Sequence, residues 1–216
     1  MSAAEYVKRL RALGPAGQVA MGKIFALSKE FVAMPLSEVN ILLDSPVHDV
    51  RVGALSIMDK QARSKKITEG QRKELFDLYL RRSDRIDSWD LVDLGAVWVV
   101  GRYLVDKPRD VLYELARSQD TWERRTAIVS TLYLVRQGEV DDTFRIAEIL
   151  LADKQDLVQK AVGGLLREAG KKDRQKLLSF LDQHAGAMAR VALSYAMEHL
   201  DNEQRVFYRA QPRKSS

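Results

Sequence analysis

A tryptophan and an aspartate occur four residues apart near the middle of the chain, as Trp89 and Asp93 in the stretch Ser88-Trp89-Asp90-Leu91-Val92-Asp93-Leu94-Gly95. On a helix this spacing places both side chains on one face, one turn from each other. A carboxylate in this position can stabilise a developing cation or activate a water molecule. An indole can stack on a base or lie against a sugar. The same residues also fit a core tryptophan and an aspartate that caps or pairs with a neighbouring helix.

The composition limits the kinds of site that the chain can build. It has 216 residues, of which 46% are hydrophobic and none is cysteine. This length allows one or at most two domains with a real core. The lack of cysteine excludes disulfides, thiol nucleophiles and thiolate metal sites, and it fits a reducing compartment. The histidines His48, His184 and His199 do not stand at metal-ligand spacing, so we expect no zinc site and no other cofactor.

The hydropathy and the charge bear on location and partners. No apolar run reaches the roughly 18 residues that a transmembrane helix needs. The N-terminal segment lacks the apolar stretch of a secretory signal, so we expect a cytoplasmic protein. Lysine and arginine exceed aspartate and glutamate by 35 to 30, a formal charge of +5. This excess permits a nucleic-acid partner, but charges scattered over a soluble protein explain it equally well.

Nearly every segment has the periodicity of an amphipathic helix. Apolar residues recur at three and four residues, as in Leu75, Leu78 and Tyr79. Glycine and proline fall mostly between these periodic segments. The sequence therefore predicts an all-α chain of roughly ten to twelve helices of ordinary length.

Four segments resemble one another, because in each a basic residue stands just before a small, apolar helix segment. These basic residues are Arg51, Arg125, Lys160 and Arg190. Paired helices that recur every 30 to 47 residues or so are typical of HEAT-like and armadillo-like solenoids. Such stacking creates a concave surface, on which equivalent basic residues would line up. That basic groove would suit a phosphate backbone. The alternative is that these residues pair with upstream acids, Asp49, Asp120 and Asp156, and only hold the repeats together.

The predicted organisation is one HEAT-like repeat domain over residues 1–210. Residues 1–45 are expected to form N-terminal capping helices and residues 46–200 the repeats. Residues 211–216 are polar and basic, and we expect a disordered tail there. A solenoid with capped ends needs no partner subunit, so we expect a monomer.

Three sequence blocks together resemble the AlkD-type DNA alkylation repair proteins. They are Trp89-Asp90-Leu91-Val92-Asp93, Trp122-Glu123-Arg124-Arg125-Thr126-Ala127-Ile128, and Val158-Gln159-Lys160-Ala161-Val162-Gly163 followed by Leu166-Arg167-Glu168. The resemblance runs over roughly residues 48–200. It implies a HEAT-like fold and DNA glycosylase activity on alkylated purines, without a metal or redox cofactor. It also implies that the base is not flipped into a deep pocket.

The resemblance assigns roles to individual residues. Asp93 matches the catalytic aspartate of that family, Trp89 a tryptophan that lies against the deoxyribose of the lesion, and Arg125 an arginine at its sugar and phosphate. The family has a second sugar-facing tryptophan where this chain has Gly164. Aromatic residues that could compensate from elsewhere are Tyr133, Trp98 and Tyr103. Further candidates for DNA contacts are Arg124, Lys160, Arg190 and Arg51.

Three functional hypotheses follow. The first is a monofunctional DNA glycosylase that acts on N3- or N7-alkylated purines in double-stranded DNA. Asp93 would stabilise positive charge on the sugar and activate water, and Trp89 would complement the cationic base. The second, motivated by Gly164, is a relative that binds damaged DNA or a DNA structure but catalyses poorly. The third is a HEAT-like scaffold that binds a protein. Salt-sensitive DNA binding would separate the first two from the third.

Overall fold

The computed structural model describes residues 1–212, and all the regular secondary structure in this range is helical, which confirms the predicted all-α class. It has thirteen α-helices, slightly more than the sequence predicts. The α-helices are α1 (Ala3–Arg11), α2 (Met21–Glu30), α3 (Leu36–Leu43), α4 (His48–Ala62), α5 (Glu69–Arg81), α6 (Trp89–Gly95), α7 (Asp110–Ala116), α8 (Thr121–Arg136), α9 (Asp141–Ile149), α10 (Asp156–Lys172), α11 (Arg174–His184), α12 (Arg190–Ala196) and α13 (Asn202–Arg209). Two 3-10 segments, η1 (Ser83–Arg85) and η3 (Tyr103–Asp106), and a π-helical segment, η2 (Ala96–Gly101), complete the secondary structure.

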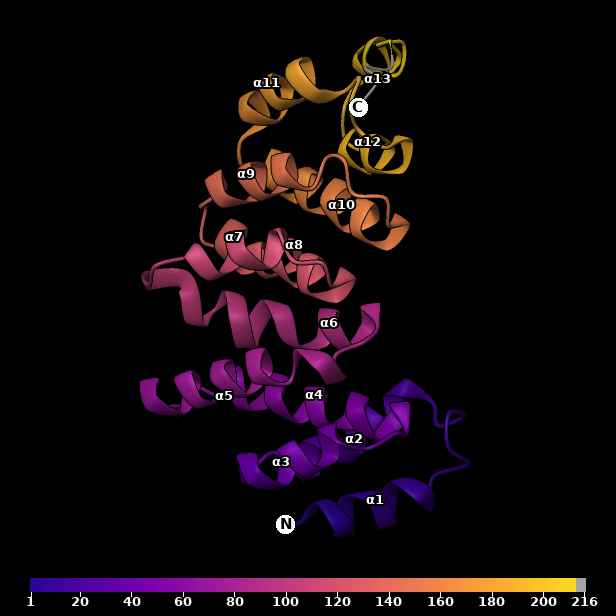
Figure 1. Ribbon diagram of the computed structural model, residues 1–216, viewed down its shortest axis with the longest axis vertical. Helices are drawn as coiled ribbons and strands as arrows, with labels where there is room; N and C mark the ends of the chain where they lie inside the picture. The colour runs from indigo at the N-terminus through magenta and orange to yellow at the C-terminus, as the bar shows by residue number, and fades with distance from the viewer. Residues whose placement is uncertain (213–216) are drawn as a thin grey trace. The chain divides into compact units, whose positions relative to one another are not determined.

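The helices form two compact units, residues 1–106 and the residues from Lys107 onward. In the first unit, α2, α4 and α6 pack in succession, and α3 and α5 form a second row beside them (Figure 1). The first helix, α1, packs on α2 and α3. This unit therefore has the paired, stacked helices of a HEAT-like repeat. That residues 1–45 form capping helices and residues 46–200 the repeats stays a prediction.

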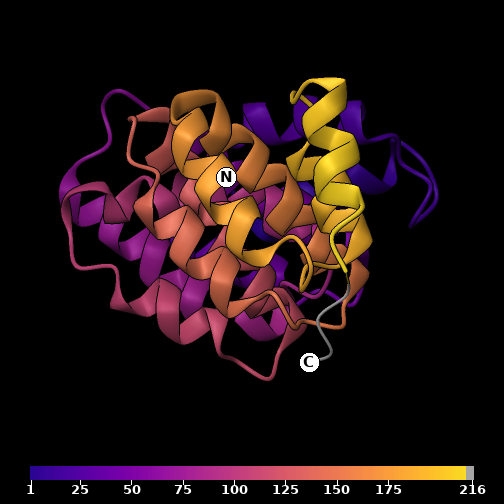
Figure 2. The same ribbon diagram turned by 90° about the horizontal axis from the view of Figure 1, so that it is seen from above.

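The second unit repeats the same plan. Here α8, α10 and α12 pack in succession, and α7, α9 and α11 form the accompanying row. The last helix, α13, lies beside α11, and the Tyr208 hydroxyl donates to Asp182 across this contact at 2.8 Å (Figures 1 and 2). The helical-repeat fold is thus confirmed within each unit. That residues 1–210 form one domain stays a prediction, and residues 213–216 of the expected tail lie outside the described part of the chain.

Local sequence determines where the helices that carry the candidate site begin. The Asp120 carboxylate accepts from the backbone N–H groups of Trp122 and Glu123 and so caps α8. Gly95 ends α6 where a Cβ would lie only 2.4 Å from the Tyr79 ring. This glycine therefore lets α6 approach the buried Tyr79 of α5 closely.

No helix among residues 1–212 is long and apolar enough to cross a membrane.

Candidate active site and nucleic-acid interface

Trp89 and Asp93 both lie on the exposed side of α6. Leu91 and Val92, between them, are fully buried, so α6 turns its apolar side to the core. The Trp89 side chain is 53% exposed and Asp93 is also exposed. A core tryptophan, the alternative interpretation of this pair, does not fit an indole with that exposure. The first unit thus presents an aromatic face and a carboxylate one helical turn apart at its surface.

The start of α6 is held by the first turn of α4. Ser88 precedes the helix, but its hydroxyl donates to Asp90 Oδ1 at 2.6 Å and does not cap the backbone. The other oxygen of Asp90 lies 2.8 Å from His48 Nε2. Burial alone would raise the pKa of Asp90, but the hydrogen bonds from Ser88 and His48 outweigh it and hold that pKa below its ordinary value. This network fixes the residues on either side of Trp89.

Arg51 lies inside the first unit and not on a binding surface. It is 7% exposed and donates to both carboxylate oxygens of Asp87, at 2.8 and 3.1 Å, and to the Ser45 carbonyl at 3.0 Å. Asp87 stands two residues before Trp89. The arginine therefore ties α4 to the segment that leads into α6. It has the internal pairing role that the sequence left open, although its partner is Asp87 and not the upstream Asp49.

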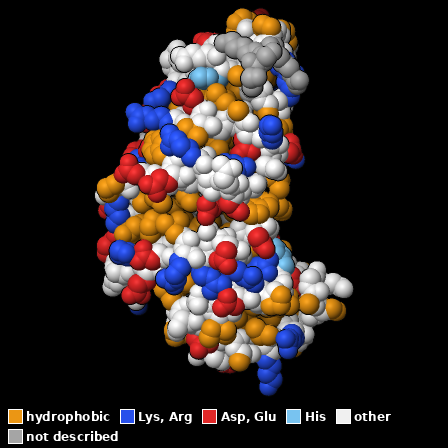
Figure 3. Space-filling view, viewed as in Figure 1, with side chains coloured by type: hydrophobic (Ala, Val, Ile, Leu, Met, Phe, Trp, Pro, Cys, Tyr) orange, Lys and Arg blue, Asp and Glu red, His pale blue; other side chains and the backbone are white. Residues whose placement is uncertain are grey.

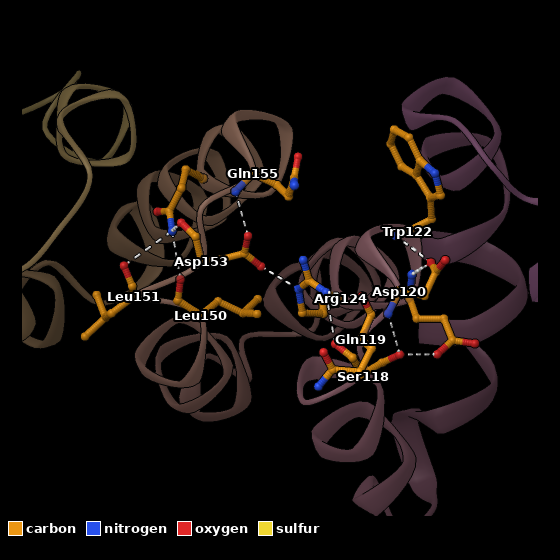
Figure 4. Close-up of polar contacts among 11 residues, drawn as sticks. Ser118, Gln119, Asp120, Trp122, Arg124, Leu150, Leu151, Asp153 and Gln155 are labelled. Carbon is orange, nitrogen blue, oxygen red and sulfur yellow. Dashed lines mark hydrogen bonds and ion pairs between the residues drawn. The ribbon is translucent and has the colours of Figure 1, made fainter. Parts of the chain in front are cut away.

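Arg124 has the same place and the same role in the second unit (Figure 4). Its Nε donates to Asp153 at 2.6 Å, and Nη1 donates to the carbonyls of Ser118 and Gln119. The Asp153 carboxylate is only 3% exposed, and its other oxygen accepts from the Gln155 N–H. The guanidinium thus holds the start of α8 against the loop before α10, and little of it remains for a DNA phosphate.

The register of the repeats differs from the one that the sequence indicates. Arg51, Arg124 and Gln159 are each the fourth residue of their helices. The Gln159 amide also donates to loop carbonyls, those of Leu150 and Asp153 at 2.8 and 2.9 Å. Arg125 and Lys160 are fifth residues, whereas Arg190 is the first residue of α12. Arg51 and Arg190 therefore do not align with Arg125 and Lys160, which corrects the predicted series of four equivalent basic residues.

Arg125, Lys160 and Arg190 belong to successive helices of the inner row in the second unit. Arg125 is 7% exposed and donates to the Leu157 carbonyl in the first turn of α10. Lys160 pairs with Asp156 at 2.7 Å across a solvent-exposed turn of α10. Arg190 is exposed and donates to the Arg209 carbonyl at 3.2 Å. On the face shown in Figure 3, basic and acidic side chains are likewise interspersed.

Gly164 lies on an open part of α10. A Cβ added there would meet nothing within 4 Å, whereas at the adjacent Gly163 it would lie 2.3 Å from the Ala192 carbonyl. A surface depression of ≈ 350 Å³ adjoins Gly164. Its lining includes Leu132, Arg136, Arg167 and Lys172. The helix therefore has room for a large side chain at residue 164.

The three aromatic residues considered as replacements do not line this depression. Trp98 belongs to the first unit, where the Arg63 guanidinium lies 4.7 Å from its ring centre. Tyr103, in the same unit, packs on Phe76 with ring centres 4.4 Å apart. Tyr133 is half-buried on α8. Sequence reasoning missed Tyr195 of α12, which is 40% exposed beside Gly163. The small residues around it gave no signal of its exposure.

His48 was also missed as part of the site. It stands 42 residues from Asp90, and a single histidine at the start of a helix carries no motif. Among the described residues, no group of three His, Cys, Asp or Glu side chains is placed to hold a metal ion.

The chain belongs to the DNA alkylation repair enzyme family, because the model of that family matches residues 4–200. This confirms the resemblance to AlkD-type proteins. A solved structure described as a predicted DNA alkylation repair enzyme from Enterococcus faecalis has a similar fold, with a TM-score of 0.67 at 15% identity. The similarity covers 93% of this chain and 95% of that chain. No curated protein matches the sequence significantly.

Proposed function

We propose that this family member is a monofunctional DNA glycosylase that hydrolyses the N-glycosidic bond of N3- or N7-alkylated purines. The observation that carries the proposal is the pair formed by Trp89 and Asp93, both exposed on α6 above a buried apolar face. A half-exposed indole leaves apolar surface in contact with water instead of burying it in the core. An aromatic ring and an anion side by side suit a flat, cationic ligand.

An alkylated purine supplies such a ligand. Alkylation at N3 or N7 gives the base a positive charge, so the base leaves with the electron pair of the bond to C1′. Positive charge then develops on the deoxyribose, where Asp93 would stabilise it. Water adds to C1′, and Asp93 would orient it and accept its proton. Trp89 would pack on the lesion nucleotide. The base departs as a neutral molecule, and the sugar remains in the strand as an abasic site.

Double-stranded DNA is the proposed partner, and the cytoplasm the proposed location. Arg125 and Lys160 would contact the backbone from the second unit, with Arg190 as a further contact. Two of these residues have weak competing partners, since the Lys160–Asp156 pair and the Arg190 contact are both exposed to solvent. Arg51 and Arg124 are given no DNA contacts, because each guanidinium already pairs with a carboxylate of its own unit, Asp87 and Asp153 respectively.

The test is base release from a duplex that carries a single 7-methylguanine, under single-turnover conditions. We expect the wild type to release the base and Asp93→Asn to do so roughly 100-fold more slowly or worse, while duplex affinity stays nearly unchanged. Asp84→Asn is the matched control, since Asp84 is an exposed carboxylate of the same unit with 66% side-chain exposure. Equal rates for Asp93→Asn and the wild type would remove the catalytic assignment.

Gly164 supports a second candidate, a DNA-damage or DNA-structure-binding protein with weak catalysis. The open space there lacks any aromatic wall of its own. The discriminating variant is Gly164→Trp, which the free volume accommodates. If the wild type binds DNA without base release and Gly164→Trp restores release, the second candidate holds. If the wild type shows no salt-sensitive DNA binding, the protein-binding scaffold becomes the better interpretation.

A further inference from the structure

Two cations at the C-terminal end of α4 each lie on an aromatic ring of a neighbouring helix. The Arg63 guanidinium is 4.7 Å from the centre of the Trp98 ring of η2, and the Lys60 ammonium is 5.5 Å from the centre of the Phe25 ring of α2. Both distances are within the range of a cation–π interaction. Lys60 and Arg63 stand three residues apart, so they share one side of α4.

A buried carboxylate sets the orientation of Arg63. The Arg63 Nε donates to both oxygens of Asp59, at 2.8 Å each, and Asp59 is only 8% exposed. Burial raises the pKa of Asp59, and the hydrogen bonds and charge of Arg63 act against that rise. Asp59 at one edge and the indole of Trp98 on one face therefore hold the guanidinium in place, although the side chain of Arg63 is 51% exposed.

The remaining edge of the Arg63 guanidinium is free. Its Nη1 and Nη2 groups donate to no atom within residues 1–212, because the hydrogen bonds of this side chain there all come from Nε. Neutralisation of Asp59 explains the bonds from Nε, and the helix dipole favours a cation at the end of α4. Neither explains an exposed edge with two N–H-bearing nitrogens in a fixed plane, the arrangement that matches the oxygens of a phosphate.

Lys60 adds a second positive charge that has no carboxylate bound to it. Its Nζ donates to the Ser56 hydroxyl at 2.9 Å, and it forms no ion pair in the described part of the chain. Burial lowers the pKa of Lys60, since a hydroxyl and an aromatic ring compensate an ammonium less well than water does. An anion that approaches Lys60 therefore has no bound carboxylate to displace.

These cations belong to the unit that carries the Trp89 and Asp93 pair. The π-helical segment η2 continues directly from α6, and Trp98 follows Asp93 by five residues, about 7 Å along the helix axis. The DNA contacts proposed above all come from the second unit.

We infer that Arg63 and Lys60 bind the phosphate backbone of DNA, with the free Nη groups of Arg63 on one phosphate and the Lys60 ammonium beside it. Asp59 and Trp98 are positioning residues for the guanidinium. The inference rests on the proposed function in that the ligand is DNA. It gives the first unit a backbone contact of its own.

The same unit contains a matched control. The Arg9 guanidinium of α1 lies 5.4 Å from the centre of the Phe31 ring, and its Nη2 pairs with Glu30 at 2.6 Å. Arg9 thus has the same chemistry as Arg63, but a carboxylate already occupies an Nη group. We expect Arg9→Met to leave the salt dependence of DNA binding unchanged.

The experiment is equilibrium binding of an undamaged duplex over a series of salt concentrations. Asp59→Asn is the reference, because loss of Arg63 alone would leave a buried carboxylate without its cation. In this background, Arg63→Met should lower the salt slope by about 0.9, and Arg63→Met with Lys60→Met by about 1.8, since each cation holds one phosphate charge. Arg63→Gln repeats the test with a polar side chain.

Two further variants separate charge from orientation. Arg63→Lys should keep the wild-type salt slope but bind DNA more weakly, because the planar fork is lost. Trp98→Leu should also keep the slope and weaken binding about two- to tenfold, because the guanidinium must then be ordered when DNA binds.

The outcomes separate this inference from the proposed function. An unchanged slope in Arg63→Met and Arg63→Gln, or an equal decrease in Arg9→Met, would overturn the phosphate contact even if the wild type releases methylated base. Lower slopes without base release would support the contact and reject the glycosylase. A wild type without salt-sensitive duplex binding would reject both. Thermal unfolding of each variant checks that the fold is retained.

Discussion

His48 Nε2 lies 2.8 Å from Asp90 Oδ2, and this contact joins the first turn of α4 to the first turn of α6. The ion pair between Arg51 and Asp87 joins the same two segments at 2.8 Å. The two acidic partners stand on either side of Trp89 in the sequence. The first turn of α4 therefore sets the position of α6, and with it the direction in which Trp89 and Asp93 point.

The Asp90 network predicts a pH dependence of stability. Because hydrogen bonds hold the pKa of Asp90 below its ordinary value, its carboxylate stabilises the fold above the unfolded-state pKa of about 3.9. That stabilisation is lost as the pH falls through the lower, folded-state pKa. Asp90→Asn should therefore lower the free energy of unfolding at neutral pH, with a deficit that shrinks below about pH 4. Urea unfolding of the wild type and Asp90→Asn across this pH range measures the deficit. A deficit that stays constant with pH would contradict the lowered pKa of Asp90.

The internal position of Arg51 gives a prediction that separates stability from DNA binding. Arg51→Ala should lower the free energy of unfolding by about 1–3 kcal/mol, because it removes charge-assisted hydrogen bonds to Asp87 and Ser45. The salt slope of DNA binding should not change. Arg190→Ala, at an exposed arginine, should show the reverse pattern, with little loss of stability and a lower salt slope. A reduced salt slope of DNA binding in Arg51→Ala would show that Arg51 contacts a DNA phosphate after all.

The pair formed by Arg124 and Asp153 is buried more deeply. Arg124→Ala leaves a carboxylate with 3% side-chain exposure without its cation, so we expect a loss of about 3–5 kcal/mol in the free energy of unfolding. The double variant Arg124→Ala/Asp153→Ala should lose less than the sum of the two single variants, because it leaves no uncompensated charge. A double-mutant cycle by chemical denaturation tests this, and additive losses would show that the two groups do not depend on each other.

The adjacent glycines of α10 should respond oppositely to the same substitution. Gly163→Ala brings a Cβ to 2.3 Å from the Ala192 carbonyl, a backbone atom, so α12 must shift at a cost of about 1–3 kcal/mol. Gly164→Ala meets no atom within 4 Å and should stabilise α10 by about 0.5–1 kcal/mol through higher helix propensity. Thermal unfolding of the two variants measures these opposite changes in stability. Similar midpoints would show that α12 is not packed tightly on Gly163.

Sequence patterns were sufficient to predict the helices and the common face of Trp89 and Asp93 on α6, but not the exposure of the two side chains. The three-and-four periodicity follows from burial of one helix face, and the spacing of Trp89 and Asp93 fixes their common face whatever the packing. The register of the repeats could not be predicted from charge. Gln159 takes the position of Arg51 and Arg124 but carries no charge, so a comparison of basic residues aligned Arg51 with Arg125 instead.

Contacts between residues that are distant in sequence could not be predicted either. Asp87 and Asp153 are ordinary acidic residues that precede helices, and only the packing brings arginines from the preceding repeats onto them. Exposure of Tyr195 depends on how α12 lies against Gly163, which is a property of two helices and not of either alone. Such contacts and exposures can be identified only when the packing of the helices is known.

The open backbone at Gly164 also offers a place for a spectroscopic label. The chain contains no cysteine, so Gly164→Cys would introduce its one thiol, in a position where a Cβ meets no neighbouring atom within 4 Å. A fluorophore or spin label attached there would stand four residues from Lys160, beside the proposed phosphate contact. Its signal would report directly when DNA occupies that surface and when it leaves.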